Sequence, residues 1–403
     1  MSRALRTPAV QRFLSARPLY LLAVGKAAPS MTSALLQNDI VPIQGLVIGT
    51  HRRDAALGSL VWRAGGHPSP DERSAAAGRE ALDLARSLSA DDRLLVLLSG
   101  GASSVMAVPA GALSIEDKRT TTSVLMSAGA DIHALNTVRK HLSAIKGGRL
   151  AAFCKGATHT LAISDVVGDD AAVIGSGPTV PDPTTFADAR RVIDALGAAP
   201  RVPRAAMSII DGGIDGEMEE SIKPGDLRLA RSEWQLIGGR HEAMAGAKEE
   251  AERLGYHTVV LNEPMAGEAR EAASDYVARL VRDPLPHPAC VISSGETTVK
   301  VVGDGLGGRN QEFVLAAAMT LSQLAEGATI ASAGTDGIDG PTNAAGAVAD
   351  TRTLRRAKEA GLSDPTAYLA RNDAYHFFER LDDLIVTGAT DTNVGDVQVA
   401  LIP

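Results

Sequence analysis

Short apolar runs alternate with longer amphipathic stretches along most of the chain, and this alternation constrains the fold most strongly. The runs are rich in Val, Ile and Leu and almost continuously apolar, as in strands that helices cover on both faces. The pattern indicates an α/β fold with mostly parallel sheets. The expected strands are 19–24, 45–49, 93–98, 159–164, 259–261, 290–293, 329–332 and 384–387. The expected helices are 74–88, 131–145, 186–196, 242–254 and 266–281.

The length of 403 residues exceeds what a single hydrophobic core usually supports, so two domains are expected. The least patterned region, 197–232, is rich in Gly and Pro and predicts a loop-rich connection. We therefore expect a first domain over 1–235 and a second over 236–403.

Composition excludes several classes of protein. The net charge of -8 argues against non-specific nucleic-acid binding, and two cysteines give no disulfide framework or cysteine-rich metal site. Neither a zinc-protease H-E-x-x-H motif nor a hydrolase G-x-S-x-G motif is present. No apolar run is long enough to cross a bilayer. The N-terminus (1–18) is Arg-rich and lacks acids, as in a transit peptide, but it has no apolar core like a secretory signal, and we expect a cytoplasmic protein.

Polar, glycine-rich turns follow the expected strands, where ligands of open parallel sheets bind. Lys26 follows the first strand and could place its ammonium on a phosphate or carboxylate. The turn with Ser99, Gly100, Gly101 and Ser103 offers N–H groups and hydroxyls to an anion, although it lacks P-loop spacing. A tight turn whose serine caps a helix is the alternative.

Other polar groups are candidates for ligand contact. His67 lies between Gly66 and Pro68 in one of these turns. A basic segment contains Asn136, Arg139, Lys140 and Lys146. It could contact a polyanion such as a nucleoside triphosphate, or it could be a solvated helix face.

Carboxylates follow two of the expected strands. Asp165 and Asp169 follow 159–164, and Asp336 and Asp339 follow 329–332. Carboxylates at strand ends are suited to binding Mg²⁺ or to accepting a hydroxyl proton. Turn formation and helix capping are the alternatives.

The segment 303–312 holds four glycines and Arg309 between an apparent strand (297–302) and an apparent helix (313–324). Close-approaching N–H groups and a guanidinium predict an anion-binding turn. Its glycines also match the dinucleotide spacing G-x-G-x-x-G, which would indicate a nicotinamide-dependent reductase. Against that, the next acid after a strand, Asp336, lies beyond the usual spacing of about 20 residues.

Taken together, several segments in order resemble the glycerate 2-kinases of the MOFRL type, some of which are called hydroxypyruvate reductases. The resembling segments are 23–27, 65–71, 98–104, 136–150, 163–183, 294–298, 307–312, 334–346 and 372–397.

The resemblance implies an active site in a cleft between a Rossmann-like N-terminal domain and a C-terminal α/β MOFRL domain. It implies transfer of the γ-phosphoryl group of ATP to the 2-hydroxyl of D-glycerate, with Mg²⁺, to give 2-phosphoglycerate. The family's lysine in G-K-A falls on Lys26, and its arginine in G-G-R-N-Q-E falls on Arg309. Oligomeric state is left open, with a homodimer as one candidate.

The predicted site therefore has three groups of residues. Lys26 and Arg309 are catalytic, and the unranked candidates for the base are Asp165, Asp169 and Glu312. The predicted metal ligands are Asp336 and Asp339. The predicted substrate- and nucleotide-binding residues are Ser99, Gly100, Gly101, Ser103, Asn136, Arg139, Lys140, Lys146, Gly295, Glu296, Thr297, Gly307, Gly308 and Asn310.

Two departures from the family pattern bear on affinity and substrate preference. Asn343 stands where an aspartate is expected, and Asp391 adds a negative charge near a supposed phosphate site. The first alternative function is an NAD(P)H-dependent hydroxypyruvate reductase. The second is a non-catalytic protein that binds small anions.

Overall fold

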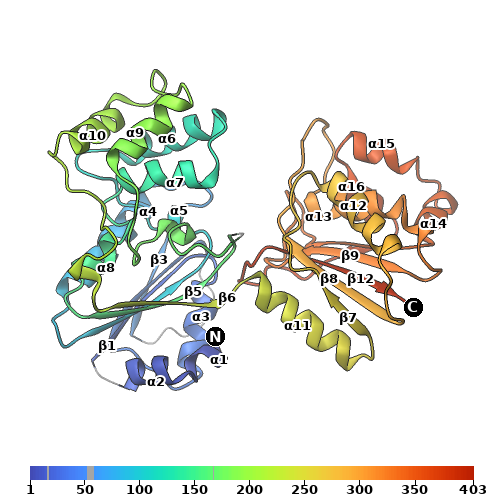
Figure 1. Ribbon diagram of the computed structural model, residues 1–403, viewed down its shortest axis with the longest axis horizontal. Coiled ribbons are helices and arrows are strands. Elements are labelled where there is room, and N and C mark those ends of the chain that lie inside the picture. The colour runs from blue at the N-terminus through green and yellow to red at the C-terminus, as the bar shows by residue number, and fades with distance from the viewer. Residues whose placement is uncertain (16–17, 52–58, 167) are drawn as a thin grey trace. The chain divides into compact units, whose positions relative to one another are not determined.

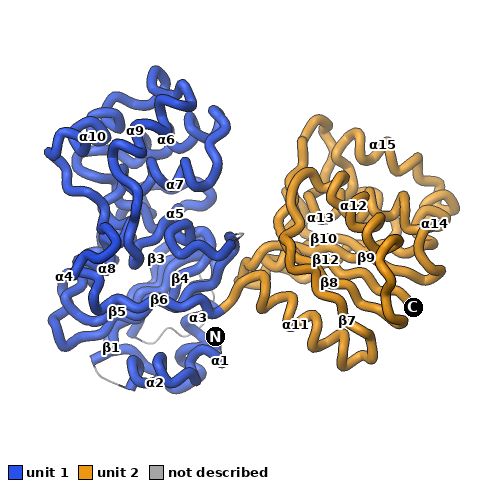
Figure 2. Tube along the Cα trace, viewed as in Figure 1, with its two compact units in different colours: residues 1–237 blue, residues 238–403 orange. Residues whose placement is uncertain are grey.

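The computed structural model describes residues 1–15, 18–51, 59–166 and 168–403; Val167, in the predicted aspartate-rich turn, lies outside these ranges. The chain forms two compact units, Met1–Ile237 and Gly238–Pro403 (Figure 2). Each unit has its own sheet and its own hydrophobic core. The predicted boundary after residue 235 falls inside the last strand of the first sheet, Ser232–Gly238.

The first unit contains a six-stranded sheet in the order β3-β2-β1-β4-β5-β6. This is the strand order of the doubly wound dinucleotide-binding folds. Strands β1 to β5 pair in parallel, which confirms the predicted Rossmann-like first domain. The strands are β1 (Leu19–Val24), β2 (Gln44–Gly49), β3 (Leu60–Ala64), β4 (Arg93–Leu98), β5 (Ala157–Ile163) and β6 (Ser232–Gly238).

Helices cover both faces of this sheet, which explains its apolar strands. Within β1, Leu22 and Val24 pack into one core cluster, and Leu21 and Ala23 pack into another on the opposite face. The helices of the unit are α1 (Ser2–Leu5), α2 (Pro8–Ser15), α3 (Ala28–Leu36), α4 (Glu72–Ser87), α5 (Ala102–Val105), α6 (Ile115–Ser127), α7 (Ile132–His141), α8 (Arg149–Phe153), α9 (Phe186–Ala195) and α10 (Arg204–Ile214). Short 3-10 turns lie at Ile174–Ser176 and Leu227–Leu229.

Helices α6, α7, α9 and α10 form a separate helical layer around the buried Phe186 (Figure 1). The prediction of a loop-rich connection over 197–232 is therefore wrong for α10. Glycines made this segment look irregular, but a Cβ at Gly213 would lie 2.1 Å from the Phe186 ring. Here a glycine permits close packing of two helices and does not mark a loop.

The second unit contains a six-stranded sheet in the order β11-β10-β9-β12-β8-β7. Its strands are β7 (His257–Val260), β8 (Ala289–Gly295), β9 (Thr329–Gly334), β10 (Gly346–Asp350), β11 (Leu384–Ile385) and β12 (Asp396–Ile402). β7 and β8 pair in parallel, whereas the other pairs are antiparallel, so the expectation of mostly parallel sheets is wrong for this unit.

Strand β12, which the sequence reading missed, lies between β8 and β9 and runs antiparallel to both. Its first residue, Asp396, therefore lies between the last residues of those strands, Gly295 and Gly334. This pairing brings an acid from near the chain's end to the edge where β8 and β9 finish.

Helices also cover both faces of the second sheet. Helices α12 and α13 contribute to the larger core, and α11 packs on the opposite face with Cys290 and Ile292. The helices are α11 (Arg240–Arg253), α12 (Ala269–Arg282), α13 (Arg309–Ala318), α14 (Thr353–Glu359), α15 (Pro365–Ala370) and α16 (Ala374–Glu379), with a 3-10 turn at Leu321–Gln323. Within the described ranges, every helix is too short or too polar to cross a membrane.

Candidate active site

The turns after β1 and β4 form the centre of a candidate site in the first unit. These neighbouring strands lie where the order of a doubly wound sheet reverses, which is where such folds bind ligands. The Lys26 amide donates to the Gly100 carbonyl at 2.8 Å, and the Ala27 amide donates to Ser99 Oγ at 3.1 Å. Both turns are therefore held together at the carboxyl edge of the sheet.

Three side chains surround the glycines of the second turn. A Cβ at Gly100 would lie 2.1 Å from Asp165 Oδ2. A Cβ at Gly101, where φ is +81°, would lie 3.1 Å from His67 Cδ2 and 3.3 Å from Lys26 Cγ. The structure thus brings together a cation, a carboxylate and an imidazole from three separate turns. Glycines at 100 and 101 allow this approach.

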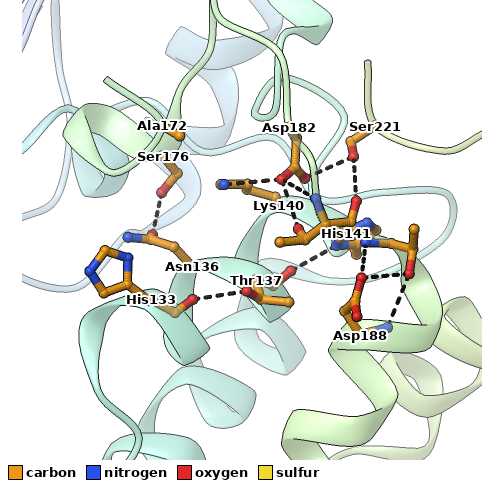
Figure 3. A network of polar contacts seen from close by, with 12 residues as sticks. His133, Asn136, Thr137, Lys140, His141, Ala172, Ser176, Asp182, Asp188 and Ser221 are labelled. Carbon is orange, nitrogen blue, oxygen red and sulfur yellow. Dashed lines mark hydrogen bonds and ion pairs between the residues drawn. The ribbon is translucent and has the colours of Figure 1, made fainter. Parts of the chain in front are cut away.

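The basic segment on and after α7 is largely buried, so its interpretation as a solvated helix face is wrong. Lys140 Nζ lies 3.1 Å from Asp182 Oδ1, and the Asp182 side chain is fully buried (Figure 3). Asp182 also accepts hydrogen bonds from Thr184 and Ser221. Burial raises the pKa of Asp182, but Lys140 and these hydrogen bonds outweigh it and hold the pKa below its ordinary value. Lys140 therefore serves an internal ion pair, contrary to its predicted contact with ligand.

Replacing Lys140 with Met is expected to lower the free energy of unfolding by about 3–5 kcal/mol, because it leaves a buried carboxylate unpaired. The double variant Lys140→Met/Asp182→Asn should regain part of that loss. Urea unfolding of the wild type and both variants measures the difference. Unchanged stability in the single variant would contradict a structural role for the pair.

A chain of hydroxyl and amide groups connects the second turn to α7. Ser103 Oγ lies 2.7 Å from Ser176 Oγ. Ser176 in turn donates to Asn136 Oδ1 at 2.8 Å (Figure 3). Lys146 Nζ donates to the carbonyls of Ser103 and Gly175. Three predicted residues are thus brought together with Ser176, which the sequence reading missed. Ser176 has φ +60°, a left-handed conformation that is costly for a residue with a Cβ.

Two other predicted bases have different surroundings. Asp169 has φ +54°, and its buried Oδ1 has no hydrogen-bond partner within the described ranges. Glu312 lies in the core of the second unit, where it accepts from Arg270 Nε at 2.7 Å and Asn372 Nδ2 at 2.6 Å. Both oxygens of Glu312 are therefore occupied, and the structure argues against its predicted role as the base.

Arg309 begins α13 and is held by two carboxylates. Its Nε and Nη2 donate to Asp396 at 2.6 and 2.9 Å, and its Nη1 donates to Glu296 at 2.6 Å. Burial lowers the pKa of Arg309, but the hydrogen bonds and charge of Asp396, with the charge of Glu296, raise it above its ordinary value. Asp396 was missed; an acid directly before an apolar strand was the available signal.

The start of α13 is capped by the protein itself. Asp339 accepts from the amides of Asn310 and Gln311 at 3.1 and 2.9 Å, and from Asn310 Nδ2 at 3.2 Å. Both carboxylate oxygens are engaged, which argues against Asp339 as a metal ligand and Asn310 as a ligand contact. A Cβ at Gly308 would lie 2.3 Å from Asp339 Cγ, so this glycine makes room for the capping side chain.

Burial raises the pKa of Asp339 to about 6. Because an unfolded Asp titrates near 3.9, the folded protein binds this proton more tightly. The stabilising contribution of Asp339 is therefore fully present below pH 3.9 and is lost as pH rises through about 6. The unfolding free energy of the wild type, relative to that of Asp339→Asn, should fall by roughly 2 kcal/mol between pH 4 and pH 7. Denaturant unfolding at the two pH values measures it, and a pH-independent difference would contradict the raised pKa.

The glycine-rich segment before α13 packs against the protein and uses several of its amides in internal hydrogen bonds. The amides of Val302 and Gly303 donate to Asn372 Oδ1, and the amide of Leu306 donates to Asp373 Oδ1. These hydrogen bonds occupy part of the backbone of the turn, so binding of an anion through the remaining amides stays a prediction. The expected strand over 297–302 is also absent, apart from an isolated bridge at Thr298. The match to G-x-G-x-x-G thus lacks the strand–turn–helix context that a dinucleotide site needs.

The remaining predicted contacts of the second unit are mostly internal. A Cβ at Gly295 would lie 2.0 Å from the Met265 carbonyl, and one at Gly307 would lie 3.3 Å from the Ala374 amide. Thr297 is buried. Asn343, the departure from the family pattern, accepts a hydrogen bond from the Tyr375 hydroxyl.

The predicted metal site is not a cluster. Within the ranges that the structure describes, no three His, Cys, Asp or Glu side chains are grouped to hold a metal ion. A Cβ at Gly334 would lie 3.3 Å from Asp336 Oδ1 and 3.5 Å from Asp396 Oδ1. Both carboxylates therefore lie beside the end of β9. Mg²⁺ that is bound to nucleotide phosphates typically has only one or two protein carboxylates as ligands, and Asp336 could supply one of them.

The structure defines a protein of two α/β units. The first unit is Rossmann-like, and its polar turns lie at the carboxyl edge of the sheet, where such folds bind small ligands. A family model described as "Domain of unknown function (DUF4147)" matches residues 2–211, and one described as "MOFRL family" matches 289–396. The chain belongs to the MOFRL-type glycerate 2-kinase family, as the resemblance implied.

Similar proteins extend over nearly the whole chain. A "Glycerate 2-kinase" of Pyrococcus horikoshii is 36% identical over 95% of this chain and 87% of its own length. A "D-glycerate 2-kinase" of Thermotoga maritima is 38% identical over 95% and 90%. A "Putative hydroxypyruvate reductase" of Agrobacterium vitis is 38% identical over 95% and 86%. A crystal structure of a glycerate kinase from Thermotoga maritima superposes with a TM-score of 0.88 at 36% identity, covering 100% of this chain and 95% of that one.

Proposed function

We propose that the protein is a D-glycerate 2-kinase that uses ATP and Mg²⁺ to form 2-phosphoglycerate. The observation that carries this proposal is the meeting of Lys26 and Asp165 at Gly100–Gly101, on the ligand edge of a Rossmann-like sheet. The names of the Pyrococcus and Thermotoga relatives support the same activity.

In the proposed reaction, the 2-hydroxyl oxygen of glycerate bonds to the γ-phosphorus while the bond to the β,γ-bridging oxygen breaks and ADP leaves. Asp165 accepts the hydroxyl proton, and Lys26 stabilises charge on the phosphoryl oxygens. Such transfers depend mainly on positioning and electrostatic stabilisation, which these two side chains can provide. Asp169 is the alternative acceptor, and loss of the acidic limb of the pH–rate profile in Asp165→Asn alone would favour Asp165.

Arg309 is proposed to bind the transferred phosphoryl group through Nη1. Asp396 holds Nε and Nη2, so it acts as a positioning residue. Nη1 contacts Glu296, which is half exposed and can be exchanged for a phosphoryl oxygen. Mg²⁺ bound with the nucleotide would be held in part by Asp336 and would neutralise charge on the phosphates.

Two parallel assays test the proposed function. One combines ATP, Mg²⁺ and D-glycerate with detection of ADP, and the other combines NADH and hydroxypyruvate. We expect ADP formation in the first, and ³¹P NMR of the product should show phosphate on O2. NADH oxidation without ADP production would instead support the reductase. A cytoplasmic location and a homodimer stay predictions.

A further inference from the structure

The buried basic segment has more hydrogen-bond donors than acceptors. Arg139 on α7 is half-buried, and its guanidinium has no hydrogen-bond or ion-pair partner among the described residues. Lys146 is only 1% exposed, and its ammonium gives two of its three N–H groups to the carbonyls of Ser103 and Gly175. A guanidinium and one ammonium N–H therefore remain without a described acceptor.

The hydroxyl chain leaves a further donor in the same place. Ser176 donates its proton to Asn136 Oδ1, so Ser103 must be the donor in its contact with Ser176. In this arrangement the Asn136 amide has its oxygen towards Ser176 and its Nδ2 directed away from it. Nδ2 has no acceptor among the described residues, although Asn136 is only 2% exposed.

Among the residues that the structure describes, no carboxylate forms an ion pair with Arg139 or Lys146. Asp182 is occupied by Lys140 and two hydroxyls, and buried Lys118 bonds only to the carbonyls of Arg139 and Leu142. Burial, and then repulsion by Arg139 and Lys118, holds the pKa of Lys146 well below its ordinary value. An uncompensated group of buried cations costs free energy, and such groups are typical of sites where a ligand supplies the missing charge.

We propose that Arg139, Lys146 and Asn136 bind the carboxylate of the acceptor substrate and so select 2-hydroxy acids over neutral polyols. This assignment rests on the proposed kinase activity and names the part of the site that recognises the acid. It differs from the sequence-based interpretation, in which the basic segment contacts a nucleoside triphosphate.

The geometry favours a carboxylate over nucleotide phosphates for two reasons. Lys146 and Asn136 are almost fully buried, so only a small anion can reach both, and a planar guanidinium pairs with a carboxylate through two parallel hydrogen bonds. This group of residues is also connected to the proposed catalytic turn, because Ser103 lies two residues after Gly101 and its carbonyl accepts a hydrogen bond from Lys146.

The test is equilibrium binding of D-glycerate to the nucleotide-free protein by calorimetry. Arg139→Met should weaken binding by about 10- to 100-fold, the usual effect of losing a hydrogen bond to a charged group. Glycerol, which lacks the carboxylate, should bind neither protein. Arg119→Met is the matched control, because Arg119 is an exposed residue of α6 whose ion-pair partner among the described residues is Glu116.

The midpoint of thermal unfolding, measured with and without D-glycerate, distinguishes a ligand-binding role of Arg139 from a structural one. Arg139→Met removes an unpartnered cation that repels Lys146, so its midpoint without ligand should equal or exceed that of the wild type. D-glycerate should raise the midpoint of the wild type much more than that of the variant. A marked loss of stability in Arg139→Met would overturn the proposal.

Kinetics separates failure of this assignment from failure of the proposed function. A KM for ATP that rises as much as the KM for glycerate in Arg139→Met, or an unchanged glycerate affinity, would overturn the carboxylate site alone. Tighter binding of inorganic phosphate than of D-glycerate would also overturn it. If the wild type neither binds nor phosphorylates D-glycerate, the proposed function itself fails.

Discussion

Gly100→Ala is expected to lower kcat/KM for glycerate phosphorylation by at least about 100-fold while the chain still folds. A Cβ at position 100 would lie 2.1 Å from Asp165 Oδ2, so the carboxylate must move. It is the end of a side chain, and φ at Gly100 is not among the positive values, so the backbone can tolerate alanine. Steady-state kinetics measures the loss of kcat/KM, and the thermal unfolding midpoint shows whether the variant folds.

A double-mutant cycle shows whether the effect acts through Asp165. Adding Gly100→Ala to Asp165→Ala should cost little further activity, because the displaced group is already gone. Gly246→Ala is the control, since a Cβ at that helical position meets nothing within 4 Å. Full activity in Gly100→Ala would remove Asp165 from the proposed mechanism.

Arg309→Ala is expected to lower kcat by about 10³- to 10⁵-fold, with a much smaller change in the KM for ATP, as for arginines that act on the transferred phosphoryl group. The single variant leaves the buried Asp396 unpaired, which would also destabilise the second unit. The double variant Arg309→Ala/Asp396→Asn removes that charge, so its kinetics report on catalysis with less effect on folding.

Glu296→Gln tests whether Arg309 depends on the charge of Glu296 or only on being positioned by Asp396. It weakens only the contact of Nη1, the nitrogen proposed to meet phosphate, and leaves the two contacts to Asp396 intact. We expect it to retain kcat. Wild-type turnover in Arg309→Ala/Asp396→Asn would show that Arg309 has only a structural role.

The first unit was the more predictable from sequence. Lys26, Gly100 and Asp165 each follow a strand of the parallel sheet by a few residues, and local apolar patterning revealed those strands. Because the carboxyl ends of β1, β4 and β5 lie side by side, turns that are distant in sequence meet at one edge.

The second unit was less predictable because its contacts join distant segments. Asp396 is 87 residues from Arg309, and Asp339 is 29 residues from the helix start that it caps. The antiparallel insertion of β12 between β8 and β9 brings Asp396 into place, and no local pattern encodes that insertion.

The sequence by itself determined which segments become strands covered on both faces and which polar turns follow them, because apolar periodicity and turn chemistry are local. Only the tertiary structure decided which polar groups are already partnered. It paired Lys140, Glu312 and Asp339 internally, and it gave Arg139 no acidic partner among the described residues. The charge of a side chain is given by its own residue, but whether an opposite charge lies beside it depends on distant segments that folding brings together.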